Sequence, residues 1–328
     1  MRPFVCCVLV TTIWSVFART TPFEPDDARA LYEEFKLKYK KTYSNDDDEL
    51  RFRIFKDNLE RAKRLQAMEQ GTAEYGVTQF SDLTSEEFKT RYLRMRFDEP
   101  IVNEDPTPQE DVTTDNSNFD WRDHGAVGPV LDQGDCGSCW AFSVIGNVEG
   151  QWFRKTGDLL GLSEQQLIDC DHSDQGCDGG YPPQTYSAIE EMGGLELRSD
   201  YPYTGKDGIC YMDQSKFVAY VNGSTRLPWC EKTQAKSLKE IGPLSSGLNA
   251  ILLQFYRRGI ILPIPLLCNP HNVNHAVLTV GYGTEFGLPY WIVKNSWGVK
   301  FGEEGYFRIF RGAGTCGINR IVSTAIIN

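Results

Sequence analysis

The segment from Gln133 to Trp140 limits the fold and chemistry of this chain more than any other. It reads Gln-Gly-Asp-Cys-Gly-Ser-Cys-Trp and sets the Cys139 thiol just before a periodic apolar stretch. Apolar side chains recur there at the spacing of one helix face, at Ala141, Val144, Ile145 and Val148. Cys139 should therefore stand in the first turn of a helix. Free N–H groups and the helix dipole lower the pKa of a thiol at that position, so the pattern predicts a nucleophile that needs a base.

Four histidines are candidates for that base. His275 opens a strand-like apolar run, Asn-His-Ala-Val-Leu, and is the strongest candidate. A lone histidine is more often structural, and the others stand in loop-like contexts, at His124, His172 and His271. The Cys136-x-x-Cys139 pair also permits a redox dithiol or half of a metal site. The sequence holds no second Cys-x-x-Cys pair that would complete a four-cysteine metal site.

Three separated motifs resemble the papain-like cysteine peptidases, the cathepsin group. They are the run around Cys139, the segment at His275, and a Lys-Asn-Ser-Trp-Gly run with Asn295 and Trp297. The resemblance extends from about residue 28 to the C-terminus. It implies that Cys139 is the nucleophile, that His275 is its base, and that Asn295 orients the imidazole. It also implies that the Gln133 side chain and the Cys139 backbone N–H bind the oxyanion. Trp297 would cover the hydrogen bond of the imidazole.

Two other classes of protein share parts of this pattern. One is a binding protein that kept the fold and lost activity, and the other is a thiol–disulfide oxidoreductase. The first is disfavoured because all four positions of the expected active site hold the expected residue types. The second would act on disulfides instead of peptides. We expect neither a metal nor another cofactor.

Composition and the first residues of the chain indicate the compartment. The chain has 34 Lys and Arg against 45 Asp and Glu, a formal net charge of −11, which argues against a nucleic-acid partner. Residues 1–18 carry an arginine, an apolar run and a final alanine, which is typical of a secretory signal peptide. No other apolar stretch is long enough to span a bilayer, so no membrane association is expected. A lysosomal or extracellular protein, in which disulfides form readily, is indicated.

The ten cysteines do not all pair. By the family resemblance the disulfides are Cys136–Cys177, Cys170–Cys210 and Cys268–Cys316, a connectivity that spacing alone does not provide. Cys230 is left over: it is a free thiol, an intermolecular link or a small buried side chain. Asn222-Gly-Ser is the one N-glycosylation sequon and should lie in an exposed loop.

Residues 19–114 resemble an inhibitory propeptide of the same family. A first helix is indicated by an apolar stripe at Ala28, Leu31, Tyr32, Phe35 and Tyr39. A second helix, from about residue 47 to 69, carries signature residues at Glu49, Arg53, Phe55, Asn58, Ala62 and Gln66. Glu49 and Arg53 are one turn apart in the order that favours an ion pair. Residues 75–82 resemble the second propeptide motif of the family.

Such propeptides run through the substrate cleft against the substrate direction and so are not cleaved. Acid would protonate carboxylates that hold the segment in place, for which Asp82 and Glu49 are candidates. Residues 98–115 hold acidic residues and prolines but no lysine or arginine, and this composition predicts an exposed, cleavable linker. The mature enzyme would begin near Asp115.

Residues 115–328 are expected to form an α+β, papain-like fold of two lobes, one helical and one β-barrel-like, with the active-site cleft between them. Ser163, with Gln166 three residues later, predicts a capping box that opens a short helix. Strands should dominate from about residue 217, notably at 276–281, 290–294 and 305–310. Cys139 would then come from one wall of the cleft, and His275 from the other.

The resemblance also implies a peptide-binding site. Gly179 and Gly180 would offer backbone groups to an extended peptide, beside Trp297. The pocket for the second residue before the scissile bond would be lined by uncharged residues, Tyr181, Pro182, Gly247, Val273, Ala276 and Ile321. We expect it to take bulky apolar side chains over arginine, because it holds no counter-charge. The short interval between Cys139 and Cys170 favours an endopeptidase over a dipeptidase.

The carboxyl half most resembles the cathepsin F-like branch of the family, in the short-prosegment form of flatworms. The resemblance rests on the residues 252–260, on Cys268-Asn-Pro and on Asn274-His275-Ala. Asn274 stands where many relatives carry aspartate. The family implies protein or peptide substrates, the chain's own propeptide as inhibitor, cystatin-type inhibitors and a monomeric state.

Overall fold

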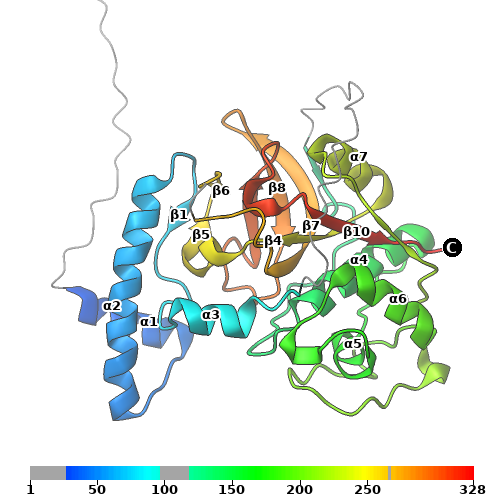
Figure 1. The fold of residues 1–328 in the computed structure, drawn as a ribbon, viewed down its shortest axis with the longest axis horizontal. Helices are drawn as coiled ribbons and strands as arrows, with labels where there is room; N and C mark the ends of the chain where they lie inside the picture. Colours follow the sequence, from blue (N-terminus) through cyan, green and yellow to red (C-terminus); the bar gives the residue numbers. More distant parts are fainter. Residues whose placement is uncertain (1–26, 97–117, 265–266) are drawn as a thin grey trace, which may run out of the picture.

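The computed structural model describes residues 27–96, 118–264 and 267–328. The expected signal peptide, the acidic linker and the propeptide boundary lie outside these residues. The described chain forms a helical prosegment, a helical lobe and a sheet lobe (Figure 1). The prosegment helices α1 and α2 lie to one side of the sheet lobe, and α3 leads toward the junction of the two lobes.

The prosegment holds α1 (Ala28–Tyr39), α2 (Asn45–Met68), β1 (Glu74–Tyr75) and α3 (Ser85–Tyr92). The helices of the remaining chain are α4 (Cys139–Thr156), α5 (Glu164–Cys170), α6 (Pro182–Met192) and α7 (Glu231–Ile241). Its strands are β2 (Phe119–Asp120), β3 (Ser224–Arg226), β4 (Leu244–Leu248), β5 (Tyr256–Arg258), β6 (Ile260–Ile261), β7 (His275–Glu285), β8 (Leu288–Lys294), β9 (Tyr306–Phe310) and β10 (Ile321–Ala325). Short 3₁₀ turns are η2 (Gly176–Asp178), η3 (Gln214–Lys216), η4 (Ile251–Phe255) and η5 (Thr315–Gly317).

The two expected prosegment helices are confirmed, and they pack through a small aromatic core of Tyr32, Phe35 and Phe55. The ion pair predicted within α2 is wrong. Arg29 of α1 binds the Glu49 carboxylate at 2.7 Å, so this carboxylate joins two helices instead of two turns of one helix. Tertiary contact has replaced the local pairing that isolated-helix reasoning favours.

Two amides of α2 organise the chain that follows it. Asn58 is buried, and its Nδ2 donates to the carbonyl oxygens of Ser81 and Leu83 at 2.9 and 2.7 Å. Gln66 accepts from the Tyr75 N–H at 2.8 Å and donates to the Ala73 carbonyl at 3.2 Å. Because these amides bind backbone groups of the chain that follows α2, including the N–H of Tyr75 in β1, they hold the segment that docks on the sheet lobe.

The helical lobe is built around α4, which packs against β7 on one side and against α5 and α6 on the other. The short helix predicted after Ser163 is present, and the Ser163 Oγ accepts from the Gln166 N–H at 3.0 Å. Only half of the predicted capping box forms. The Gln166 side chain instead donates to the Gly194 carbonyl and accepts from the Glu196 N–H, which joins α5 to a neighbouring loop.

The sheet lobe is an eight-stranded sheet in the order β3-β10-β4-β7-β8-β9-β6, with β2 added to β7. The predicted strands at 276–281, 290–294 and 305–310 correspond to β7, β8 and β9. Hydrogen bonds from Ser143 of α4 are among those that join the lobes: its Oγ lies 2.6 Å from the Val277 carbonyl oxygen and 2.7 Å from the Ser245 Oγ. The start of α4 therefore faces the start of β7, which is the arrangement that the α+β, two-lobed prediction requires.

Candidate active site

Cys139 is the first residue of α4, as the periodicity predicted, and its side chain is fully buried. Burial raises the pKa of its thiol to about 11, although backbone N–H groups of Ala276, Arg94 and Trp140 act in the opposite direction. The expectation of a low thiol pKa from the helix start alone is therefore wrong for this state of the protein, because loss of hydration outweighs the dipole. The Ala276 contact brings the sulfur beside the residue that follows His275.

His275 is the first residue of β7, and Asn295 directly follows β8. The His275 Nε2 and the Asn295 Oδ1 are 2.8 Å apart. The Ser296 N–H also donates to this Oδ1, at 2.9 Å, which makes the atom an acceptor. The proton of the neutral ring therefore sits on Nε2, and the Nδ1 lone pair is left to act as a base. Nδ1 is buried without a hydrogen-bond partner.

The imidazole is held in its neutral form. Burial lowers the pKa of His275 to about 4, against smaller contributions from Asn295 and the Tyr92 backbone that raise it. With the thiol pKa near 11, both groups are uncharged between about pH 4 and pH 11. A thiolate–imidazolium pair needs hydration or a closely placed opposite charge, and here prosegment residues cover both groups. Met95 of the prosegment contacts Cys139, and the Tyr92 backbone lies at His275, so the prosegment contributes to the burial of both groups.

Trp297 covers the imidazole as the resemblance implied. Its ring stacks on His275 with centroids 4.7 Å apart, and it is fully buried. Three prosegment rings meet it edge-on, with centroid distances of 5.1, 5.4 and 5.9 Å, from Phe80, Phe88 and Tyr92. The Gln79 Nε2 adds a hydrogen bond to the Trp297 carbonyl at 2.9 Å. The prosegment is therefore anchored on the same indole that shields the candidate base.

Gln133 lies beside the start of α4 and is held by both lobes. Its Nε2 donates to the Cys136 carbonyl at 3.0 Å, and its Oε1 accepts from the Ser296 hydroxyl at 2.6 Å. The Oε1 contact fixes the orientation of the amide, so the Nε2 end faces the Cys136–Cys139 turn. One N–H of that amide remains for a further acceptor. This geometry fits the oxyanion role that the resemblance implies for Gln133.

The prosegment passes through the cleft as an extended strand. Met95 forms a parallel bridge with Gly180, its N–H donates to the Asn274 carbonyl at 3.1 Å, and the Arg96 N–H donates to the Gly180 carbonyl at 2.9 Å. The Asn274 side chain uses its Oδ1 to accept from the Ala250 N–H at 3.0 Å. The backbone of Gly180 thus binds an extended segment, in the manner that the sequence predicts for a peptide substrate.

The predicted pocket residues come together around the Met95 side chain. Met95 forms one buried apolar cluster with five residues, Cys139, Tyr181, Val273, Ala276 and Ile321. Gly247 pairs with Ala276 and Ile321 across the sheet, and a methyl group on it would lie 3.0 Å from the Met95 sulfur. Gly179 contacts the Arg94 carbonyl. Pro182 is buried as the first residue of α6 and lies outside the cluster.

Sequence reasoning missed two residues of the site. Met95 itself was not identified, and its only signal is an apolar side chain between two arginines. Asp174 is the second: its carboxylate accepts from the Tyr181 N–H at 2.7 Å and from the Thr185 hydroxyl at 2.8 Å. Burial, with repulsion from Asp171, raises its pKa. Asp174 therefore positions the pocket wall at Tyr181, a role that no local pattern indicates.

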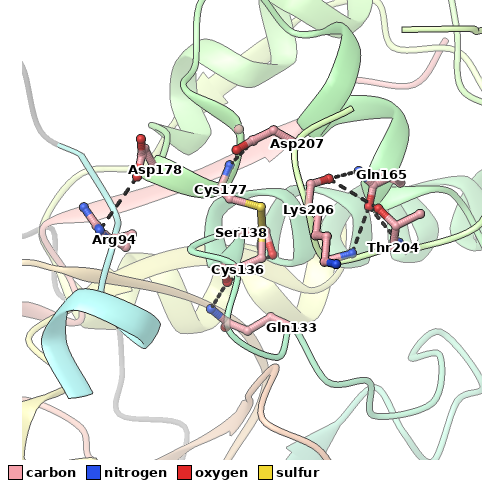
Figure 2. Close-up of a disulfide and its surroundings, with 12 residues drawn as sticks. Arg94, Gln133, Cys136, Ser138, Gln165, Cys177, Asp178, Thr204, Lys206 and Asp207 are labelled. Carbon is pink, nitrogen blue, oxygen red and sulfur yellow. Dashed lines mark hydrogen bonds and ion pairs between the residues drawn. A yellow bond between two sulfur atoms is a disulfide. The ribbon is translucent and has the colours of Figure 1, made fainter. Parts of the chain in front are cut away.

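The three disulfides that the resemblance implies are present: Cys136–Cys177, Cys170–Cys210 and Cys268–Cys316. Cys139 and Cys230 are the free cysteines of the described chain, and Cys230 is half-buried. The first disulfide ties the turn before α4 to the loop that carries Gly179 and Gly180 (Figure 2). No group of histidines, cysteines or carboxylates in the described ranges could hold a metal ion.

Fold and site together define a two-lobed cysteine protease with its prosegment in the cleft. Comparison with protein families agrees: residues 116–326 match the papain family cysteine protease model, and residues 32–88 match the cathepsin propeptide inhibitor domain. The chain belongs to the papain family of cysteine proteases and carries the propeptide of a zymogen.

Among its relatives, cathepsin F of Mus musculus is 45% identical over 91% of this chain, and cathepsin F of Drosophila melanogaster is 41% identical over 92%. The chain spans 65% and 51% of the lengths of these two proteins. Cysteine proteinase 1 of Dictyostelium discoideum is 38% identical, over 98% of this chain and 99% of its own length.

Solved zymogens share the fold. Procathepsin L 3 of the Tenebrio molitor larval midgut superposes with a TM-score of 0.80 at 35% identity, over 92% of this chain and 99% of that one. A recombinant stem bromelain precursor gives 0.81 at 33% identity, over 92% and 100%. The predicted fold class and family are therefore confirmed.

Proposed function

We propose that this protein is made as a secreted zymogen whose mature form is an endopeptidase acting through a thioester at Cys139. Once the prosegment leaves, His275 Nδ1 takes the proton of the thiol, and the sulfur attacks the peptide carbonyl carbon. Gln133 Nε2 and the Cys139 N–H stabilise the oxyanion. The imidazolium returns its proton to the leaving amine, the C–N bond breaks, and a thioester remains. Water, deprotonated by His275, then hydrolyses the thioester.

We assign bulky apolar side chains to the second residue before the scissile bond. The observation that supports this assignment is Met95, an apolar side chain that fills the pocket next to Cys139. The pocket lining is uncharged, so an arginine there would lose hydration without gaining a partner. A leucine, valine or phenylalanine would bury a comparable apolar area.

Peptides that differ only at this residue test the assignment. The acid-processed enzyme should hydrolyse a leucine or valine peptide with a higher kcat/KM than the matched arginine peptide. An irreversible epoxide probe should label one thiol per molecule, with no labelling of Cys139→Ala and sharply slower labelling of His275→Ala. A preference for arginine would overturn the substrate assignment, and labelling that is independent of His275 would overturn the mechanism.

Secretion, compartment and partners belong to the same proposal. The apolar first residues support a signal peptide, 1–18, and the disulfides fit an oxidising compartment, lysosomal or extracellular. Among the described residues, no helix is long and apolar enough to cross a membrane. Asn222 is exposed, as a glycosylation acceptor must be. We further propose a propeptide of residues 19–114, a mature domain of 115–328, a monomeric state and inhibition by cystatin-type proteins.

A further inference from the structure

Two carboxyl groups lie close together in the loop that follows α5. Asp171 is the first residue after this helix and is 5% exposed, and Asp174 is half-buried. The Asp171 Oδ1 accepts from the Ser173 N–H at 2.8 Å, from the Ser173 hydroxyl at 2.6 Å and from the Asp174 N–H at 3.2 Å. Its Oδ2 is buried and has no hydrogen-bond partner within the described ranges. Because a buried carboxylate oxygen without a donor is costly, this atom needs a donated proton.

The Asp174 carboxyl is placed to donate that proton. Asp171 acts on it through a side-chain hydrogen bond as well as through its charge. Two carboxyl groups form such a bond only when one of them is protonated, because an ionised carboxylate has no donor. Loss of hydration raises the pKa of Asp174, and repulsion from Asp171 raises it further. Asp174 therefore keeps a proton at pH values at which an isolated aspartate is already ionised, and its O–H can donate to the Asp171 Oδ2.

Charged and titratable side chains of the surrounding segments do not take the place of this proton. They are His172 on the loop itself, Asp169 of α5, Asp178 of η2, Asp207, Arg226 of β3, and Arg94 and Arg96 of the prosegment. His172 is exposed, and Arg226 lies over the Tyr181 ring, 5.4 Å from its centroid. Both prosegment arginines leave with the prosegment. None of these side chains donates to the Asp171 Oδ2, so in the described chain the pair depends on its own proton.

Asp174 connects this pair to the backbone that binds the peptide. Its Oδ1 accepts from the Tyr181 N–H at 2.7 Å, and its Oδ2 accepts from the Thr185 hydroxyl at 2.8 Å. A methyl group on Gly180 would lie 2.7 Å from the Asp174 carboxyl carbon, so the carboxyl packs directly against the Gly180 backbone. Two ionised carboxylates cannot stay buried side by side without a cation, and the loop must move or admit water to separate them. That movement would displace Gly180 and Tyr181.

We propose that Asp171 and Asp174 share one proton, and that this shared proton keeps Gly180 and Tyr181 in the position that binds a peptide. Both aspartates are positioning residues, because neither touches the reacting atoms. The folded state holds the proton more tightly than the unfolded chain, so the stability of the loop is present in acid and is lost as pH rises through the raised pKa of Asp174. Peptide affinity should follow the same direction. This inference rests on the proposed peptidase function.

The expected effect is on KM. Between about pH 5 and about pH 8, KM of the processed enzyme for a leucine peptide should rise about two- to ten-fold, the effect of losing about one hydrogen bond to the displaced segment. The value of kcat should follow only the ionisations of the reacting groups, Cys139 and His275. A blocked peptide without titratable groups ensures that the substrate keeps its charge over this range.

Two asparagine variants test the shared proton. In Asp174→Asn the amide oxygen can still accept from the Tyr181 N–H, and the amide N–H replaces the shared proton toward Asp171. Asp171→Asn removes the repulsion from the other side, and it keeps the test decisive if Asp174→Asn fails to fold. The control is His172→Gln, because histidine is the other side chain of this loop that ordinarily titrates near neutral pH.

Wild-type enzyme and His172→Gln should both show the rise in KM. Both asparagine variants should keep a low KM that stays constant within about two-fold, with the pH profile of kcat unchanged. A constant KM in the wild type, the same rise in both asparagine variants, or loss of the rise in His172→Gln would overturn the shared proton. Failure of the wild-type enzyme to cleave any leucine peptide at any pH would instead refute the peptidase proposal, so the two failures are distinguishable.

Discussion

Truncation of Met95 tests how the prosegment closes the active site. Met95 is 7% exposed and packs with Tyr181, Val273 and Ile321 directly above Cys139. The change Met95→Ala leaves the backbone hydrogen bonds to Asn274 and Gly180 in place. It therefore isolates the contribution of one side chain in one pocket.

The magnitude follows from the burial of the side chain. Replacing a buried methionine with alanine costs about 2–5 kcal/mol, and the lower part of that range applies where water can enter the emptied pocket from an open cleft. A loss of about 2–3 kcal/mol raises the population of the open segment about 30- to 150-fold, because each 1.4 kcal/mol is tenfold.

The rate at which Cys139 is alkylated in the intact zymogen measures the population of the open segment. The thiol is fully buried, so even a small reagent such as iodoacetamide reaches it only when the segment opens. Labelling is measured at pH 7.5 in a Cys230→Ser background, since Cys230 is the other free thiol of the described chain. A rate proportional to reagent concentration shows that reclosing is faster than labelling, and gels confirm that the zymogen stays uncleaved.

Met95→Ala should be labelled about 30- to 150-fold faster than the parent zymogen. The control is Met68→Ala: Met68 ends α2 and is 46% exposed, so its rate should stay within about two-fold of the parent. Equal rates for Met95→Ala and the parent would refute the reasoning, since the pocket contact would then contribute nothing to closure.

The remaining predictions concern the oxyanion site, the prosegment and the thiol. Gln133→Ala should lower kcat of the processed enzyme about 10²- to 10³-fold in titrated kinetics, and an unchanged kcat would remove this amide from the oxyanion site. The Arg51 guanidinium holds the pKa of Glu87 near 2, so the ionised carboxylate stabilises the prosegment above its ordinary pKa of about 4.5 and loses this effect as pH falls toward 2. Glu87→Gln should therefore lower the Tm of the zymogen by about 2 °C at pH 7, with a difference that shrinks in acid; a constant difference would contradict the pairing. Because burial raises the pKa of Cys139 to about 11, its alkylation rate in the zymogen should keep rising with pH up to that value, whereas a plateau below pH 7 would show that the ion pair already exists.

Local sequence patterns predicted the helix and strand positions that depend on consecutive residues alone. The apolar spacing after Cys139 predicted the start of α4, and the flanks of His275 and Asn295 predicted the strand ends where both residues lie. Helix and strand periodicities are properties of consecutive residues, so they can be recognised without knowing what packs against them. The disulfide pairs came from family resemblance and not from spacing, which leaves many pairings open.

Predictions failed where a polar group had more than one partner to choose from. Glu49 binds Arg29 of another helix instead of Arg53 one turn away, and the Gln166 side chain binds a neighbouring loop instead of its own helix start. Local and tertiary partners differ little in energy for such groups, so the packing of the whole fold decides between them. Rules based on local sequence do not predict that packing.

The sequence by itself determined the chemical identity of this protein: a thiol at a helix start, an imidazole and an amide at strand ends, and a helical prosegment before them. Only the tertiary structure decided whether the thiol and the imidazole are charged. Met95 packs on the thiol, and the aromatic side chains of the prosegment pack on the indole that covers the imidazole. Burial raises the pKa of the thiol and lowers that of the imidazole, and both changes favour the uncharged forms. The physical reason is desolvation, which depends on what surrounds a group in space and not on its neighbours along the chain.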